Sequence, residues 1–571
     1  MSKNEIALVI LWASAVLSVA HAQDKTTTTT PIEHVVVIVG ENMSFDALFG
    51  TYQPPQGQSV SNLLSRKIIH ADGTPGPNYS AALQKIPATS GKYLVDYPES
   101  TAYAVLPRPY ARKANGRGRD IDNSLPADLP PGPFQITRYR PYTEFTGSSP
   151  VHRFFQMWQQ VNAGRKDLFV WTSMSSGEGS SDKANPANST GLSSEAMAFY
   201  NMASGDVPYF NQLARTYSIS DNYHQSIMGG TMANYFAMAT GGDVIRYLKD
   251  GVPGVPPQAQ IENPEPLPGS ANWYTHSGYS SGSYTACADE HQPGVGAIRA
   301  YLGSLPYRVF NGGNCEAGTY YLVNNYSPYY SPGGSPQVLG TRLYVAPPQT
   351  APTIAQALSA KAITWRWYHG GRSSRGVKRG DYSSDMDPLT FSKEVMETDL
   401  KKNLVSDSEL FDDIKGQMPS VAFVAPPVSR TGHPASGTPA AFEAYAKGIV
   451  ETIQANPKLW EKTAIFITTD EGGGYYDSGY IQPIDFFGDG TRIPLIAVSP
   501  WARPGYVGHT YYDSVSLLKF IERNWGLKPL SRRSRDNLPN PQASADPYVP
   551  GNRPALGDLF ELFDFSRSLK N

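Results

Sequence analysis

Two short apolar runs, far apart in the chain, constrain the fold more than any other feature of the sequence. They are His34–Gly40 (HVVVIVG) and Thr463–Thr469 (TAIFITT), and both are rich in β-branched residues. Such uninterrupted runs are typical of strands that are buried on both faces of a parallel sheet. Similar strand-like runs occupy residues 217–221, 363–368, 420–425 and 493–498, and helix-like patterns occupy residues 151–161, 442–455 and 514–525. This alternation predicts an α/β three-layer sandwich with a mostly parallel central sheet and long loop insertions.

Polar residues follow each of the two apolar runs directly. Glu41 and Asn42 come after the first run, and Asp470 and Glu471 come after the second. In open α/β sheets, ligands bind beyond the carboxyl ends of the strands, so we expect these four side chains to meet at one edge. Carboxylates that meet in one place repel one another unless a cation or raised pKa values relieve the repulsion. The pattern therefore predicts a metal-dependent hydrolase.

A threonine after two glycines is the candidate nucleophile. Gly229 and Gly230 precede Thr231, which stands at the start of a predicted helix. A glycine pair lets the backbone approach an anion closely, and a helix start favours negative charge. The alternative is that Thr231 merely caps the helix, which is a common role for threonine.

The N-terminal residues have the pattern of an export signal. Lys3 is followed by a mostly apolar run at 6–20 and by small residues at the cleavage positions of Ala20-His21-Ala22. This pattern predicts a signal peptide at 1–22 and a polar linker at 23–31, hence a periplasmic or secreted protein. The alternative is a membrane anchor. No later segment reaches transmembrane length, and a net charge of −2 gives no basic excess for binding nucleic acid or a membrane surface.

The remaining chain is predicted to form one catalytic domain at 32–540 and a C-terminal tail at 541–571. Within the domain, residues from about 241 to 345 are rich in Gly, Pro, Tyr and Ser and are interpreted as an insertion that shapes a pocket. The chain has 2 cysteines, Cys287 and Cys315, and both fall in this insertion. In an exported protein, such a pair is expected to form a disulfide.

Several motifs, in order along nearly the whole mature chain, resemble a known family. Residues 32–46 (IEHVVVIVGENMSFD) resemble the opening motif of the bacterial phosphoesterase family, which holds secreted acid phosphatases and phospholipases C of the alkaline phosphatase superfamily. Residues 221–231 resemble its nucleophile segment, and residues 470–477 (DEGGGYYD) resemble its acidic segment. Residues 492–494, 508–510 and 520–522 fit its C-terminal part, and residues 151–154 and 432–434 are most similar to the acid phosphatase branch.

The resemblance implies an alkaline-phosphatase-like fold and a role for each candidate residue. Thr231 would be the nucleophile and would form a phosphothreonine, while His152 and His433 would bind phosphate or protonate the leaving group. One divalent metal ion would be held by a set of oxygen ligands from Glu41, Asn42, Thr231, Asp470 and Glu471. Asn42 would also bind the substrate phosphate. These ligands suit Mg²⁺, Ca²⁺ or Mn²⁺ at least as well as Zn²⁺.

The sequence departs from the family pattern at several positions. Met43 stands where the family usually has arginine, and Gly472 stands for asparagine in the acidic segment. No adjacent histidine pair follows Asp387-Pro388-Leu389, and His369, just past a strand, is a spatial substitute to test. The prediction is an acid phosphatase that acts on small phosphate monoesters. The alternatives are a phospholipase C acting on phospholipid, and an inactive binding protein on the same fold.

Overall fold

The computed structural model describes residues 27–89, 91–112, 119–146, 149–176, 194–266, 283–337, 344–373 and 376–569. The predicted signal peptide and the start of the linker lie outside these ranges. The alternative prediction, a membrane anchor at the same residues, also falls outside them. Within the described ranges, no helix is both long enough and apolar enough to cross a membrane.

The centre of the molecule is an eight-stranded sheet with the order β17-β14-β18-β1-β19-β20-β8-β21. Its strands are β1 (His34–Gly40), β8 (Ser218–Ser220), β14 (Trp365–His369), β17 (Leu404–Ser406), β18 (Val421–Ala425), β19 (Thr463–Thr469), β20 (Leu495–Val498) and β21 (Val507–Gly508). All strand pairs are parallel except the two that β20 makes with β19 and β8. The predicted mostly parallel sheet is confirmed, and its two longest strands, β1 and β19, are neighbours at its centre.

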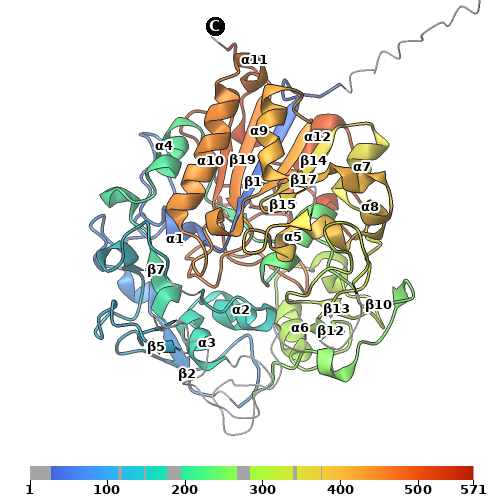
Figure 1. The fold of residues 1–571 in the computed structure, drawn as a ribbon. Helices are drawn as coiled ribbons and strands as arrows, with labels where there is room; N and C mark the ends of the chain where they lie inside the picture. Colours follow the sequence, from blue (N-terminus) through green and yellow to red (C-terminus); the bar gives the residue numbers. More distant parts are fainter. Residues whose placement is uncertain are drawn as a thin grey trace, which may run out of the picture.

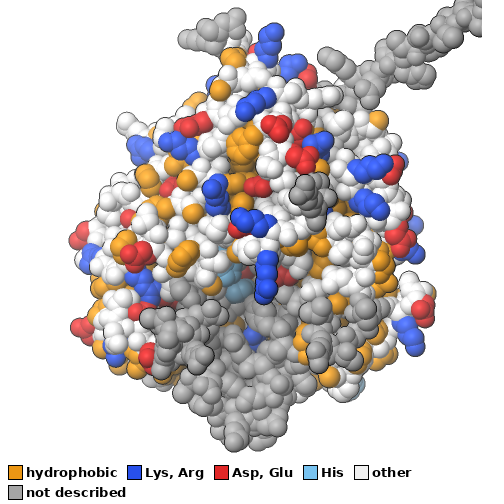
Figure 2. Space-filling model, viewed as in Figure 1, with side chains coloured by type: hydrophobic (Ala, Val, Ile, Leu, Met, Phe, Trp, Pro, Cys, Tyr) orange, Lys and Arg blue, Asp and Glu red, His pale blue; other side chains and the backbone are white. Residues whose placement is uncertain are grey.

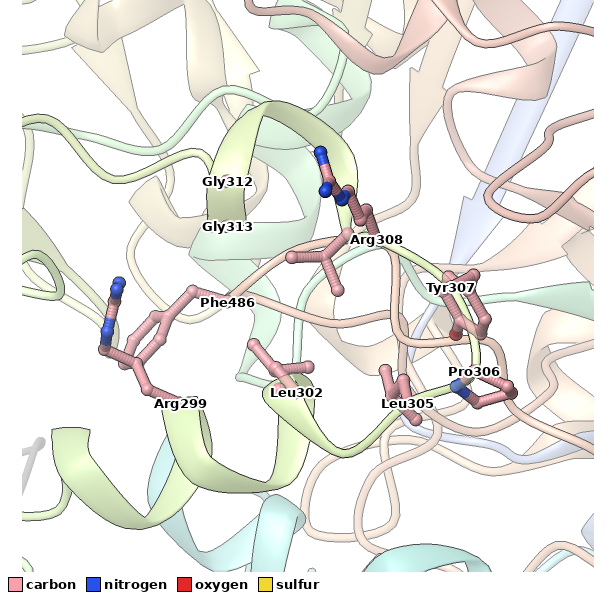
Figure 3. Close-up of a pocket in the computed structure, with 11 residues that line it drawn as sticks. Arg299, Leu302, Leu305, Pro306, Tyr307, Arg308, Gly312, Gly313 and Phe486 are labelled. Carbon is pink, nitrogen blue, oxygen red and sulfur yellow. The ribbon is translucent and has the colours of Figure 1, made fainter.

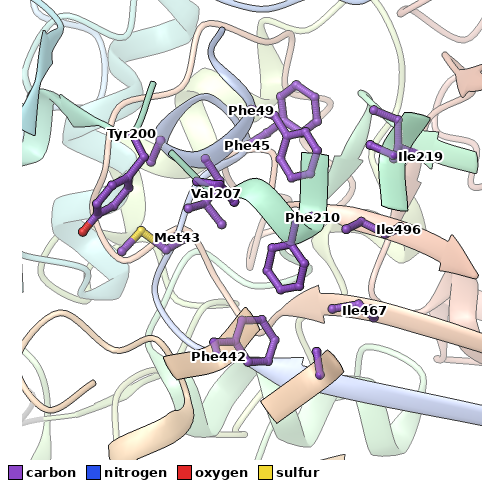
Figure 4. Packing of buried hydrophobic residues seen from close by; sticks show 14 of the residues in the cluster. Met43, Phe45, Phe49, Tyr200, Val207, Phe210, Ile219, Phe442, Ile467 and Ile496 are labelled. Atoms are coloured by element: carbon purple, nitrogen blue, oxygen red, sulfur yellow. The ribbon is translucent and has the colours of Figure 1, made fainter. Parts of the chain in front are cut away.

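Alternate residues of β1 contribute to two separate hydrophobic cores, one on each face of the sheet. Val36 and Ile38 pack on one face, with Phe210 and Phe442 from the covering helices, as Figure 4 shows for this core. On this side lie α1 (Phe45–Phe49), α4 (Pro208–Thr216), α9 (Asp407–Lys415), α10 (Pro439–Gln454) and α11 (Pro457–Trp460).

The opposite face of the sheet is covered by a second set of helices. These are α5 (Thr231–Thr240), α7 (Ile354–Ala360), α8 (Lys393–Glu397) and α12 (Ser516–Trp525), whose apolar residues join the core formed by Val35, Val37 and Val39. The ribbon in Figure 1 shows the sheet between the two sets of helices. The predicted three-layer α/β sandwich is therefore confirmed.

The helix expected over 151–161 begins three residues later, as α2 (Phe154–Val161). Arg153 has an extended backbone, with φ −97 and ψ 155, and the imidazole of His152 bonds to the carbonyl oxygen of Pro150 at 2.6 Å. The residues before Phe154 therefore form a loop. This loop, rather than a helix face, positions His152.

The insertion contains small ordered elements below the sheet in Figure 1. Among them are α6 (Val295–Gly303) and the ribbons β10 (Leu248–Lys249) with β11 (Val252–Pro253) and β12 (Tyr284–Thr285) with β13 (Tyr321–Leu322). Cys287 and Cys315 form the predicted disulfide, with their Cα atoms 5.5 Å apart. The insertion also packs against α2 in the lower part of the molecule, through a core shared by α2 and α6.

Candidate active site

The carboxyl ends of β1 and β19 lie side by side, as the sequence predicted. Gly40 is aligned with Thr469 at the end of the parallel pair, and the Asp470 amide donates to the Gly40 carbonyl at 3.0 Å. Asn42 has a left-handed backbone with φ 58, and its amide donates to Oδ1 of Asp470 at 3.2 Å. The two acidic segments are thus brought together by the register of the two central strands.

A glycine-rich turn after β19 holds the acidic segment in place. The Gly473 amide donates to Oε2 of Glu471 at 2.8 Å. Gly473 has φ 61, and a Cβ atom at this position would lie 2.7 Å from Asn42. Only glycine fits both the backbone conformation and the close approach.

Thr231 lies against the acidic cluster. It is the first residue of α5, and the N-cap position belongs to Gly230, which makes no side-chain capping bond. The Thr231 side chain lies close enough to Asp470 to lower the pKa of that carboxyl group, and it is 6% exposed. The alternative in which Thr231 serves as the helix cap is therefore wrong.

Burial and mutual repulsion raise the pKa values of the clustered carboxyl groups. Burial first, and then the charges of Asp470 and Asp385, raise the pKa of Glu41 well above its usual value. Burial raises the pKa of Asp470 to about 7, although the hydrogen bond from the Asn42 amide and the nearby Thr231 side chain oppose the rise. Burial and Asp470 likewise raise the pKa of Glu471. Without a compensating cation, these carboxyl groups therefore hold their protons more tightly than free carboxyl groups do.

Three buried oxygen atoms in this cluster have no hydrogen-bond partner among the described residues: Oδ1 of Asn42, Oδ2 of Asp470 and Oε1 of Glu471. Unpartnered buried acceptors are costly, and a hard cation would satisfy all three. No group of three Asp, Glu, His or Cys side chains in the described ranges is arranged to hold a metal ion. A cation held here would therefore need neutral oxygens, such as Oδ1 of Asn42, among its ligands.

The structure brings both predicted histidines to the edge of the cluster. Nε2 of His152 lies 3.6 Å from Oε1 of Glu471, and Nε2 of His433 lies 3.9 Å from Oε2 of Glu41. Burial lowers the pKa of His152 to about 4, and burial together with His152 lowers that of His433 to about 3. Both imidazoles are therefore neutral at neutral pH, and neither contact is an ion pair.

Asp385 was not identified from the sequence. It lies in the 3₁₀ turn Ser384–Met386, its charge raises the pKa of Glu41, and burial raises its own pKa to about 6. His369, the suggested substitute for a missing histidine, does not serve that role. Its two ring nitrogens bond to the carbonyl oxygens of Gly370 and Ser383 at 2.6 and 2.8 Å.

The insertion contributes a second residue that the sequence did not indicate. Oδ1 of Asn325 accepts a hydrogen bond from the Met232 amide at 3.2 Å, in the first turn of α5. A Cβ atom at Gly230 would lie 3.3 Å from this oxygen and 3.6 Å from the ring of His152. The amide group of Asn325 therefore stands beside the nucleophile turn. Because the insertion has no regular hydrophobic period, no pattern in the sequence marks this residue.

The face of the molecule that Figure 1 presents has a depression at its middle. Figure 2 shows histidine and acidic atoms inside a hollow at the middle of the face that Figure 1 presents. A separate cavity of about 640 Å³ lies between α6 and the 3₁₀ turn Phe310–Gly313, and none of the predicted site residues lines it. Figure 3 shows Leu302 of α6 and Phe486 at this cavity, with Arg299 and Arg308 at its margins.

Comparison with known proteins places the chain in a family. The model of the phosphoesterase family matches residues 32–528, which is most of the chain. The chain belongs to the phosphoesterase family. This confirms the resemblance found in the motifs.

Two curated relatives connect this phosphoesterase-family chain to different enzyme names. A non-hemolytic phospholipase C of Burkholderia pseudomallei is 24% identical over 95% of this chain and 61% of its own length. A probable acid phosphatase of Kluyveromyces lactis is 25% identical over 38% of this chain and 52% of its own length. The chain thus spans less than two thirds of either relative.

Among solved structures, a protein in the alkaline phosphatase superfamily from Vibrio parahaemolyticus aligns with 58% of this chain and 63% of its own. The sequence identity is 10% and the TM-score is 0.27. A likeness at this level carries no argument, so the assignment to the α/β class depends on the sheet and its two helical layers.

Proposed function

We propose that this chain hydrolyses phosphate esters by transferring the phosphoryl group to Thr231 at a site that holds one divalent metal ion. The observation that carries the proposal is the position of Thr231, whose side chain lies close enough to Asp470 to influence its pKa, beside a buried cluster with three unpartnered oxygens. A threonine hydroxyl is a weak nucleophile and needs activation by a base or by a metal. The bound ion would neutralise charge on the reacting oxygens.

Four other features of the site would bind and activate the substrate. Thr231 opens α5, so the phosphoryl group would meet the positive end of a helix. Asp470, which lies beside the Thr231 side chain, would accept a hydrogen bond from the hydroxyl and orient it. Burial keeps His152 and His433 neutral, but a phosphate anion beside either imidazole would raise its pKa and allow it to carry a proton to the leaving group.

Phosphate monoesters are the substrates we propose first. The sequence motifs around His152 and His433 favour the acid phosphatase branch, and both side chains lie within 4 Å of the carboxylates. Hydrolysis of p-nitrophenyl phosphate by the metal-loaded protein is the direct assay. If the metal-loaded protein turns over neither monoesters, diesters nor phospholipid, the third alternative, a binding protein on the same fold, is favoured.

A phospholipase C is the second candidate, and two observations favour it. The relative named phospholipase C aligns with 95% of the chain. The insertion also has an apolar cavity of about 640 Å³ and two exposed valines, Val252 and Val255, near β11. Parallel assays with p-nitrophenyl phosphate and phosphatidylcholine vesicles separate the two candidates, because the preferred substrate is the one with the higher kcat/KM.

Replacement of Thr231 by alanine tests the proposed mechanism. We expect Thr231→Ala to lower kcat by about 10²-fold or more, because the phosphoryl acceptor is lost. Thr231→Ser should keep partial activity because the oxygen remains. The matched control is Thr438→Ala, since Thr438 does cap a helix, accepting from the Ala441 amide at 3.1 Å. The control should lose about 1 kcal/mol of stability and keep its turnover.

We also propose export, on the pattern of residues 1–22 alone. Intact-mass analysis of protein from the periplasm or medium should find an N-terminus near Gln23. Retention of the full N-terminus would contradict this.

A further inference from the structure

A second set of reactive side chains lies at the far end of the same sheet edge. β8 and β21 are parallel, with Ser220 aligned to Gly508. Asp221 follows β8 and His509 follows β21, so the two side chains emerge together. Ser59, from the loop after α1, meets them there.

The contacts among these three residues follow a serine–histidine–aspartate order. Oγ of Ser59 lies 3.1 Å from Nε2 of His509, and Nδ1 of His509 lies 2.8 Å from Oδ1 of Asp221. Each ring nitrogen therefore has one partner, which is the arrangement of a nucleophile, its base and the group that orients the base. Ser59 is exposed, whereas Asp221 is completely buried.

Asp221 is fixed by bonds to its second oxygen. Oδ2 accepts from the Ser61 amide at 2.7 Å and from the Tyr548 hydroxyl at 2.9 Å. Burial lowers the pKa of His509, but the hydrogen bond and charge of Asp221, with help from Glu561, outweigh burial and raise the pKa. The imidazolium that forms when His509 accepts a proton is thus stabilised.

The loop that carries Ser59 is anchored and offers two amide donors. The Gln58 side chain accepts from the Val507 amide at 3.1 Å, which ties the loop to β21. The amides of Ser59 and Val60 donate to no acceptor within the described part of the chain. In acyl transfer, amides at and just after the nucleophile are suited to stabilise a developing oxyanion.

We propose that Ser59, His509 and Asp221 form a second nucleophilic site, at which Ser59 accepts acyl groups from short carboxylic esters. Oγ of Ser59 would bond to the carbonyl carbon while its proton passes to Nε2 of His509. The ester C–O bond then breaks, and the proton leaves with the alcohol. Water, activated by the same imidazole, releases the carboxylic acid and restores Ser59. We propose short esters as the substrates because the Ser59 hydroxyl is exposed.

An alkyl fluorophosphonate reports this reactivity directly. It reacts with an activated serine to form a P–O bond with loss of fluoride. The test uses the full chain with Thr231→Ala, so that the phosphoryl-transfer site does not contribute. We expect labelling on the peptide that contains Ser59, at a rate about 10²-fold or more above that of an unactivated serine, because general-base catalysis contributes at least this much.

Ser566 provides the matched comparison. It is an exposed serine whose hydroxyl bonds to a carboxylate, Asp564, at 2.6 Å, with no imidazole. Ser59→Ala and His509→Gln should each abolish the fast labelling and the hydrolysis of p-nitrophenyl acetate. Labelling of Ser59 no faster than that of Ser566 would overturn the proposal, and so would ester hydrolysis unchanged in Ser59→Ala. Because Ser59 is exposed, its replacement leaves the fold intact, so loss of labelling reports chemistry.

Discussion

Replacement of Asp470 by asparagine should affect stability with opposite signs in the absence and presence of metal. Asp470 is completely buried, and burial raises its pKa from 3.8 to about 7. A folded-state pKa above the unfolded value means that the folded protein binds the proton more tightly. Without metal, stability is therefore highest below about pH 4 and falls as the pH rises through about 7.

The size of the stability difference follows from the pKa shift of Asp470. A rise of about 3 pKa units corresponds to about 4 kcal/mol, at about 1.4 kcal/mol per unit. In chelator at about pH 8, Asp470→Asn should therefore be more stable than wild type by up to about 4 kcal/mol, because it removes an uncompensated buried charge. At about pH 4 the two proteins should differ little, since the wild-type side chain is then protonated.

Urea unfolding at both pH values, with chelator and with added divalent metal, measures these differences. With metal bound, the order should reverse, because the variant loses a charged ligand. Asp477→Asn is the matched control. Asp477 is also buried after β19, but the charge and hydrogen bond of Arg492 hold its pKa below the usual value despite burial. This control should destabilise the protein at about pH 8 with or without metal. If the metal-free Asp470→Asn protein is less stable than wild type at about pH 8, the Asp470 charge is not an uncompensated cost in the metal-free fold.

Three further changes test other parts of the account. Cys315→Ser should lower the free energy of unfolding by about 3 kcal/mol, because the disulfide closes a loop with a sequence separation of 28. Urea titration measures this loss, and an unchanged unfolding midpoint would contradict it. Asn325→Asp should weaken inhibition by inorganic phosphate by about tenfold, because the new carboxylate repels phosphate at the nucleophile turn. If the variant and wild type are inhibited equally, Asn325 lies outside the site. Gly473→Ala should abolish turnover because its Cβ would clash with Asn42, while Gly448→Ala in α10, where nothing lies within 4 Å, should stabilise the protein by about 1 kcal/mol with normal activity.

The parts of the site that follow regular strands were predictable from the sequence. Val35 to Val39 and the matching run in β19 have an unbroken apolar pattern, so burial on both faces and adjacency at the centre of a parallel sheet followed. The residues next in sequence, Glu41 and Asp470, then had to emerge at the same edge. The antiparallel direction of β20 was not predictable, because an apolar run has the same pattern in either direction.

Residues supplied by irregular segments were missed for a physical reason. Asp385 lies in a single 3₁₀ turn, and Asn325 follows the two-residue strand β13 in the insertion. Neither segment has a period that would show which side chains face inward. The helix start at Phe154 was misplaced for a similar reason, since the loop before it is fixed by a side-chain bond of His152 and not by backbone propensity.

Trapping the covalent intermediate would show whether Thr231 accepts the phosphoryl group. Metal-loaded protein is mixed with a radiolabelled phosphate ester, quenched in acid during turnover and digested, and the labelled peptide is identified by mass spectrometry. We expect acid-stable phosphothreonine at Thr231, absent from Thr231→Ala and from chelator-treated protein. Turnover without any label on Thr231, or full turnover by Thr231→Ala, would contradict this expectation.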